Sequence, residues 1–170
     1  MLRFLDAVEA LLVKAIKIAL ILTTLVLVVV VSYQVISRIS ELLPQWRATE
    51  ELARGMFVWL VALGASLGVR NGGHFALDLF GESSADIKRR LAYLRVAVIV
   101  AIAAIFAFHG WEFLQSGFRR RSLITGLSSA WWYSSFFVAG CLMLLFSLRE
   151  VAGMVLGQPR ADTETSPGSV

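Results

Sequence analysis

The chain has 170 residues, of which 58% are hydrophobic and 16% charged, with a net charge of +4 and a mean hydropathy of +0.74. Soluble domains carry about a quarter charged residues, so this composition excludes an ordinary globular enzyme and a disordered chain. The apolar residues form long runs. Because a transmembrane helix needs roughly 20 residues, the length fits about four spans and leaves no room for a soluble catalytic domain. The basic residues lie between the apolar runs, where membrane orientation and lipid headgroups explain them better than nucleic acid does.

The first 36 residues predict two kinds of membrane-associated helix. Residues 1–17 carry apolar side chains at spacings of three and four, with the charges mostly on the other side. This pattern predicts an amphipathic helix in the membrane interface, and the alternative is a cytosolic extension of the first span. Residues 18–36 contain no charge and can cross the bilayer. Their apolar core is too long for a cleavable signal peptide, so we predict a retained span.

A connector and a second span follow. Residues 38–50 contain Pro44, which breaks or bends a helix, and Trp46, a residue typical of the membrane interface. We expect this connector to lie along the membrane surface. The second span, 52–70, contains a G-x-x-x-G pattern at Gly64 and Gly68. Small residues at this spacing let another helix approach closely, either from this chain or from another subunit.

The remaining elements are read in the same way. Asn71-Gly72-Gly73 predicts a turn, and residues 74–80 could form a short amphipathic segment in the headgroup layer. The third and fourth spans are predicted at roughly 96–114 and 127–148. Residues 151–170, rich in Pro, Gly, Ser and Thr, are expected to be mostly disordered.

Together these elements predict an all-α integral membrane protein with four transmembrane helices and amphipathic interfacial helices. Its parts are an interfacial helix at 1–17, a four-helix membrane domain at 18–150 and a tail at 151–170. With four spans, the two termini and the 70–95 loop share one side and hold ten Lys and Arg residues, against six on the other side. The positive-inside rule then places both termini in the cytoplasm.

The chemistry of transport, redox reactions and catalysis is sparse in this chain. Transporters place ionisable groups at midplane depth, and the centres of the first, second and fourth spans have none. His74 and His109 lie more than about 15 Å apart in depth, so they cannot hold one haem between them. His109 and Glu112 are instead predicted to form a polar pair near the outer interface. Nucleotide-binding, hydrolase and zinc-protease motifs are absent from the sequence, which predicts no catalytic, cofactor or metal site.

One stretch of the sequence is more specific. Residues 50–54 read EELAR, residues 59–65 read WLVALGA, and residues 70–74 read RNGGH, with Asp78 soon after. This stretch strongly resembles the small membrane subunit of tripartite ATP-independent periplasmic (TRAP) transporters, the DctQ-type family. The resemblance extends to the length and the four-span layout of the whole chain. The family tends to carry prolines around its fourth span, and here that region has none, so no role is carried over to that helix.

The resemblance implies a transporter made of three proteins with separate roles. The chain would be a non-catalytic small permease subunit of the bacterial inner membrane, acting as a scaffold or stator for a large membrane subunit. That large subunit would move organic acids by coupling to sodium, and a periplasmic binding protein would deliver the substrate. No cofactor is expected in this chain, and the substrate is selected elsewhere. The alternatives are a self-contained small oligomeric transporter and, as a weaker reading, the membrane anchor of a redox enzyme.

The same stretch supplies the candidate residues for anchoring the fold or the partner. These are Glu50, Glu51, Arg54, Gly64, Gly68, Arg70, His74 and Asp78. Glu50 and Arg54 are four residues apart and can pair along a helix. Arg70, His74 and Asp78 share that spacing and could tie the turn to its helix or to the partner through charged hydrogen bonds.

A run of three arginines, Arg119, Arg120 and Arg121, lies on the predicted outer face, against the overall charge bias. A solvated loop is one interpretation. The other is a docking site for an acidic patch on the binding protein, where such charges would mainly affect the association rate and its salt dependence.

Overall fold

The computed structural model describes residues 2–40, 44, 46–78, 85–122 and 124–156, and the side chains of 2–6, 72–78, 85–89 and 154–156 are not described. Within these residues the chain forms helices α1 (Leu2–Ile39), α2 (Ala48–Asp78), α3 (Ala85–Phe118) and α4 (Ala130–Leu156). Each is long and apolar enough to cross a membrane. The predicted all-α fold with four spanning helices is therefore confirmed.

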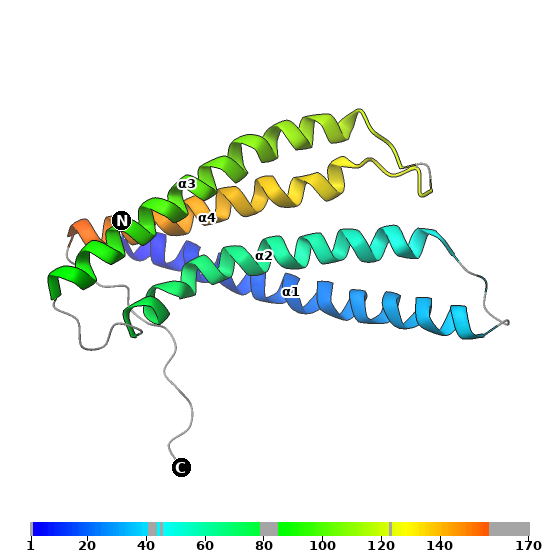
Figure 1. The fold of residues 1–170 in the computed structure, drawn as a ribbon, viewed down its shortest axis with the longest axis horizontal. Coiled ribbons are helices and arrows are strands. Elements are labelled where there is room, and N and C mark those ends of the chain that lie inside the picture. Colours follow the sequence, from blue (N-terminus) through cyan, green and yellow to red (C-terminus); the bar gives the residue numbers. More distant parts are fainter. Residues whose placement is uncertain (1, 41–43, 45, 79–84, 123, 157–170) are drawn as a thin grey trace, which may run out of the picture.

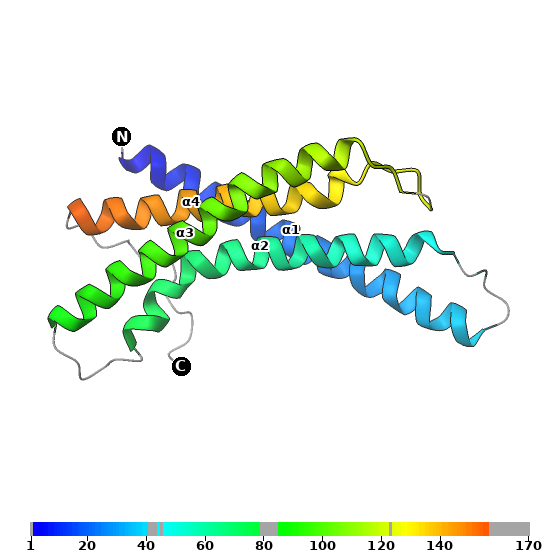
Figure 2. The same ribbon diagram turned by 45° about the horizontal axis from the view of Figure 1, so that its top comes forward.

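The helices form two antiparallel pairs, α1 with α2 and α3 with α4, and α2 packs against α4 to join them (Figure 1). One end of the molecule holds the connector at residues 40–47 and the loop at residues 119–129; we call it the connector end. The opposite end holds the start of α1 and the end of α4, and we call it the terminal end. In the second view α1 crosses behind the other helices (Figure 2), and Glu9 of α1 reaches Arg149 of α4.

Helix α1 is continuous, and no break separates residues 1–17 from the first span within the described part. The face that packs on the other helices carries Glu9, Val13 and Ile16. Most other large apolar side chains of α1, from Val8 to Ile39, are exposed. A helix that presents apolar side chains on most of its circumference needs lipid or a partner protein to cover them.

The turn predicted at Asn71-Gly72-Gly73 is wrong, because α2 continues through these residues to Asp78. Each helical glycine disfavours the helix by only about 1 kcal/mol. Near a membrane, breaking the helix would leave backbone groups without hydrogen-bond partners, which costs several kcal/mol per group. The helical hydrogen bonds therefore outweigh the two glycines. The segment expected at 74–80 belongs to α2 as far as Asp78, and the rest of it lies outside the described residues.

The closest packing lies between α3 and α4. Val96, Ala103 and Gly110 recur at every seventh residue of α3, followed by Gly117, and all four are buried. A Cβ added to Gly110 would lie 2.7 Å from the backbone nitrogen of Phe137, and one added to Gly140 would lie 2.4 Å from that of Ala107. The two backbones are thus in contact, which only glycine permits.

Candidate functional site

A buried ionic cluster ties three helices together at the terminal end. The Glu9 carboxylate on α1 has a side chain only 6% exposed. Its Oε1 accepts a hydrogen bond from Arg70 Nε on α2 at 3.0 Å, and its Oε2 forms an ion pair with Arg149 Nε on α4 at 2.5 Å. Both arginines are largely buried, at 22% and 25% exposed. A buried carboxylate is tolerated only when it is paired and hydrogen-bonded in this way.

A second ion pair lies at the same end, between Arg95 of α3 and Glu150 of α4. Both side chains are less than one-fifth exposed. Since Glu150 follows Arg149 directly, one turn of α4 forms ion pairs with both α1 and α3, and α2 joins them through the contact between Arg70 and Glu9. These contacts fix the helix arrangement at the terminal end and leave the two carboxylates engaged with arginines.

Arg70 connects α2 to α1, and its partners differ from those that the spacing suggested. It binds Glu9 and, through Nη1, the amide oxygen of Asn71 at 3.1 Å. His74 and Asp78 lie on the continuing α2 helix, and their side chains are outside the described set. Glu9 was placed by the sequence pattern on the charged side of an interfacial helix. The sequence does contain an indication that Glu9 is buried: Glu9, Val13 and Ile16 share one helix face, at spacings of four and three.

At the connector end, Glu51 fastens the 119–129 loop to α2. Its Oε2 accepts hydrogen bonds from Ser122 Oγ at 2.5 Å and from Thr125 Oγ1 at 3.1 Å. Ser122 Oγ also accepts from the backbone nitrogens of Ile124 and Thr125, which shapes the turn. Gly126 adopts a left-handed conformation, φ +69°, as this turn requires. Glu51 therefore connects the first turn of α2 to this loop.

The predicted pair between Glu50 and Arg54 is not formed among the described residues. Glu50 Oε1 instead accepts from Arg38 Nη2 of α1 at 3.2 Å, and Arg54 is exposed. The connector brings Arg38 within reach of the first turn of α2, a proximity that spacing along α2 does not reveal. Both side chains of the Arg38 pair are more than half exposed, so the pair contributes only about 0–1 kcal/mol.

Aromatic side chains lock α2 to α4 near the connector end. Trp59 Nε1 donates to the Trp131 carbonyl oxygen at 3.1 Å, and the two indole rings lie 5.9 Å apart. The ring of Trp132 covers Gly55 so closely that an added Cβ would lie 1.8 Å from it. Gly55 is therefore a packing glycine that the sequence reasoning missed.

Gly64 and Gly68 lie on an open face. An added Cβ at either position has no heavy atom within 4 Å beyond its own helix and neighbours. The spacing of these glycines predicted that a helix of this chain or of another subunit approaches closely. Among the described residues no helix of this chain does so, and the first of these two alternatives is wrong. The exposed side chains of Phe57 and Val61 continue the same face of α2 toward the connector end.

Arg119, Arg120 and Arg121 are all exposed and lie where α3 ends and the loop begins. The loop below them is ordered by the antiparallel bridge between Arg121 and Ser128 and by the hydrogen bond from Ser129 N to the Arg120 carbonyl oxygen at 3.0 Å. Three arginines on an ordered loop present a basic surface at the connector end.

The predicted His109–Glu112 pair is confirmed, with Nδ1 and Oε2 at 2.9 Å on the exposed side of α3.

The helix interiors hold little polar chemistry. No acidic or basic residue occurs between Lys17 and Arg38, between Arg54 and Arg70, between Arg95 and His109, or between Arg121 and Arg149. Hydroxyl groups at mid-helix bind the backbone of their own helix: Thr24 to Leu20, Ser66 to Leu63, Ser135 to Trp132 and Ser147 to Met143. In the part of the chain that the structure describes, no group of three His, Cys, Asp or Glu residues could hold a metal ion.

Comparison with known proteins gives two matches. The family model for the DctQ component of tripartite ATP-independent periplasmic transporters matches residues 27–157. The sialic acid TRAP transporter small permease protein SiaQ of Vibrio cholerae serotype O1 is 27% identical over 110 residues, which are 63% of this chain and 62% of that protein. The matched part therefore covers less than two thirds of this relative.

Proposed function

The chain belongs to the DctQ family of TRAP transporter components, and from this premise we propose that it is a scaffold for a large membrane subunit that carries the transport path. It is a multi-pass membrane protein with four helices able to span the bilayer. In the proposed assembly the large subunit couples organic-acid uptake to sodium, and a periplasmic binding protein delivers the substrate.

The observation that carries the proposal is the position of the charged groups in the helices. Each helix contains a long stretch without acidic or basic residues, at 18–37, 55–69, 96–108 and 130–148, and the buried Glu9 is engaged with two arginines. A transporter that worked alone would need polar or ionisable groups at mid-depth to bind substrate and coupling ion. The mid-helix hydroxyl groups named above bind their own backbones instead. This chemistry supports a structural role more than a self-contained transporter or a haem-bearing anchor.

The open face of α2 supports the presence of a partner helix. Gly64 and Gly68 expose backbone that no other described helix of this chain covers, and small residues of this kind allow a membrane helix to pack closely. Replacing both with Leu would fill the space that the partner occupies. In the isolated chain these substitutions meet open space, so the fold should survive.

Co-purification tests this proposal. The large subunit, co-expressed with the tagged chain, should be recovered in lower yield with Gly64→Leu/Gly68→Leu, while the melting temperature of the variant chain alone stays the same. The matched control is Val61→Leu, which changes an exposed apolar residue of the same face by one methylene. Equal recovery of the large subunit with parent and double variant would show that this face meets lipid.

We also propose that the arginine run at residues 119–121 docks the binding protein. The three exposed side chains on an ordered loop support this role. Exposed charges mainly change association rates, so replacing all three with Ser should slow uptake at limiting binding protein, and excess binding protein should restore part of it. An unchanged dependence on binding-protein concentration and on salt would favour a solvated loop.

A further inference from the structure

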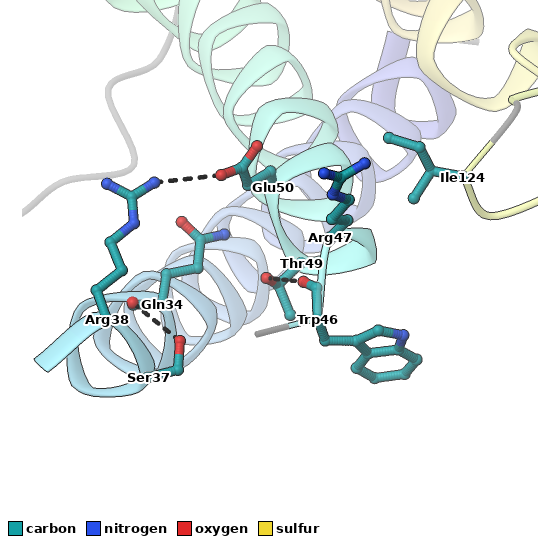
Figure 3. A pocket seen from close by; sticks show the side chains of 8 residues that line it. All are labelled: Gln34, Ser37, Arg38, Trp46, Arg47, Thr49, Glu50 and Ile124. Atoms are coloured by element: carbon teal, nitrogen blue, oxygen red, sulfur yellow. Dashed lines mark hydrogen bonds and ion pairs between the residues drawn. The ribbon is translucent and has the colours of Figure 1, made fainter. Parts of the chain in front are cut away.

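A pocket of about 430 Å³ lies at the connector end, between the last turns of α1 and the beginning of α2. The residues that line it are Gln34, Ser37, Arg38, Trp46, Arg47, Thr49, Glu50 and Ile124 (Figure 3). The pocket lies where a spanning helix ends, and most of its lining side chains are polar or charged, whereas the core between the helices is apolar. Neither the fold nor the proposed scaffold role accounts for it.

The pocket carries a net positive charge. Arg38 and Arg47 supply two guanidinium groups, and Glu50 supplies one carboxylate. Arg38 shares a single contact with Glu50, at 3.2 Å, and a guanidinium has five N–H donors. Most donors of the two arginines therefore stay available. Each guanidinium group is planar and presents parallel N–H donors, so two of its N–H groups can bind two oxygens of one phosphate group.

A buried donor in the pocket lacks an acceptor. The Gln34 side-chain nitrogen is buried and has no hydrogen-bond partner among the described residues. Leaving a donor buried without a partner costs free energy, and an anionic ligand oxygen in the pocket would remove that cost.

An apolar stripe leads from the pocket toward the middle of α1. Val28, Val31 and Val35 are exposed and precede Arg38 at spacings of three, four and three, so they share one helix face. At 1.5 Å per residue the stripe is about 10 Å long, enough to support about half of an acyl chain. The exposed indole of Trp46 lies beside the pocket and points away from the arginines, as a residue anchored in the membrane interface would (Figure 3).

We propose that this pocket binds the phosphodiester headgroup of a membrane phospholipid. Arg38 and Arg47 hold the phosphate oxygens, the Gln34 amide donates a further hydrogen bond, and one acyl chain lies along Val28, Val31 and Val35. A free anion or an acidic side chain of a protein would use the arginines but not the apolar stripe. A phospholipid would engage the arginines, the Gln34 amide and the stripe together.

Native mass spectrometry of the full chain in detergent, titrated with palmitoyl-oleoyl-phosphatidylglycerol, tests the site. Arg38→Gln/Arg47→Gln should weaken the binding about tenfold or more, since each arginine supplies a charged hydrogen bond. The matched control Arg119→Gln/Arg120→Gln removes the same charge from the same end of the molecule and should bind like the parent. Diacylglycerol with the same acyl chains should not bind, and inorganic phosphate should not displace the lipid.

Gln34→Met gives a second test that does not alter charge. It should weaken phosphatidylglycerol binding while leaving the lipid-free melting temperature unchanged or higher, because the buried donor is gone. Binding within twofold of the parent in the Arg38/Arg47 variant, or an equal loss in the control, would overturn the proposal. The proposal would also be overturned if Arg38→Gln/Arg47→Gln left lipid binding unchanged and altered only how uptake depends on the concentration of binding protein. The pocket would then contact that protein.

Discussion

At the scale of single residues, burial decides which ion pairs matter. Glu9 holds two arginines from two other helices and is almost fully buried, whereas the pair between Arg38 and Glu50 is exposed. Removing one partner from a buried ionic cluster leaves charges unpaired inside the protein, while an exposed pair is solvated by water in either state.

Glu9→Gln should therefore destabilise the chain strongly. The neutral amide removes the negative charge that Arg70 and Arg149 share, and such losses reach about 3 kcal/mol when the partners are partly buried. Glu50→Gln, which breaks the exposed pair, should cost less than about 1 kcal/mol. Thermal unfolding of both variants in the same detergent measures the difference. Equal melting temperatures would mean that the Glu9 cluster is open to water.

At the scale of helices, the position of each glycine relative to its neighbours sets its role. Gly140 of α4 touches the α3 backbone at Ala107, while Gly64 of α2 faces open space. Gly140→Ala should destabilise the chain by about 1–3 kcal/mol because the helices must move apart. Gly64→Ala should be neutral or stabilise it by up to about 1 kcal/mol, since Ala favours helix. Thermal unfolding that shows Gly64→Ala as the more harmful change would contradict this packing.

The four spans could be predicted because their apolar runs determine them directly. The helices themselves are longer than the predicted spans: the first three extend beyond them at both ends, and the fourth runs from Ala130 to Leu156 instead of 127–148. The glycines that pack helices could not be assigned in this way. Gly64 and Gly68 carry the familiar spacing yet face outward, whereas Gly110 and Gly140 are seated at the contact between α3 and α4. Which glycine meets a neighbour depends on which helices are adjacent, and a single sequence does not encode that in its local spacing.

The candidate site was predictable to a similar extent. Glu51 bonds to the loop between α3 and α4, and Arg70 bonds to α1, but their partners Ser122 and Glu9 lie more than 60 positions away in the chain. Helical spacing finds partners three or four residues apart, so it suggested Arg54 for Glu50 and His74 for Arg70. The contacts actually formed come from the folding of the chain into two helix pairs.

At the scale of the whole molecule, the two ends differ in charge and should lie on opposite sides of the membrane. The excess of basic residues at the terminal end predicts that both termini are cytoplasmic. Reporter fusions at Val170 and within the 119–122 loop should give cytoplasmic and periplasmic signals, respectively. The same signal from both fusions would contradict the four-span topology.

The scaffold role concerns the assembled transporter, and reconstituted uptake tests it most directly. Proteoliposomes would receive this chain alone, the large subunit alone, or both, each with the binding protein, its organic-acid substrate and a sodium gradient. Because the spans of this chain carry no charged group at mid-depth, we expect no sodium-driven uptake from the chain alone and full uptake only with both subunits. Sodium-dependent uptake by this chain without the large subunit would contradict the account.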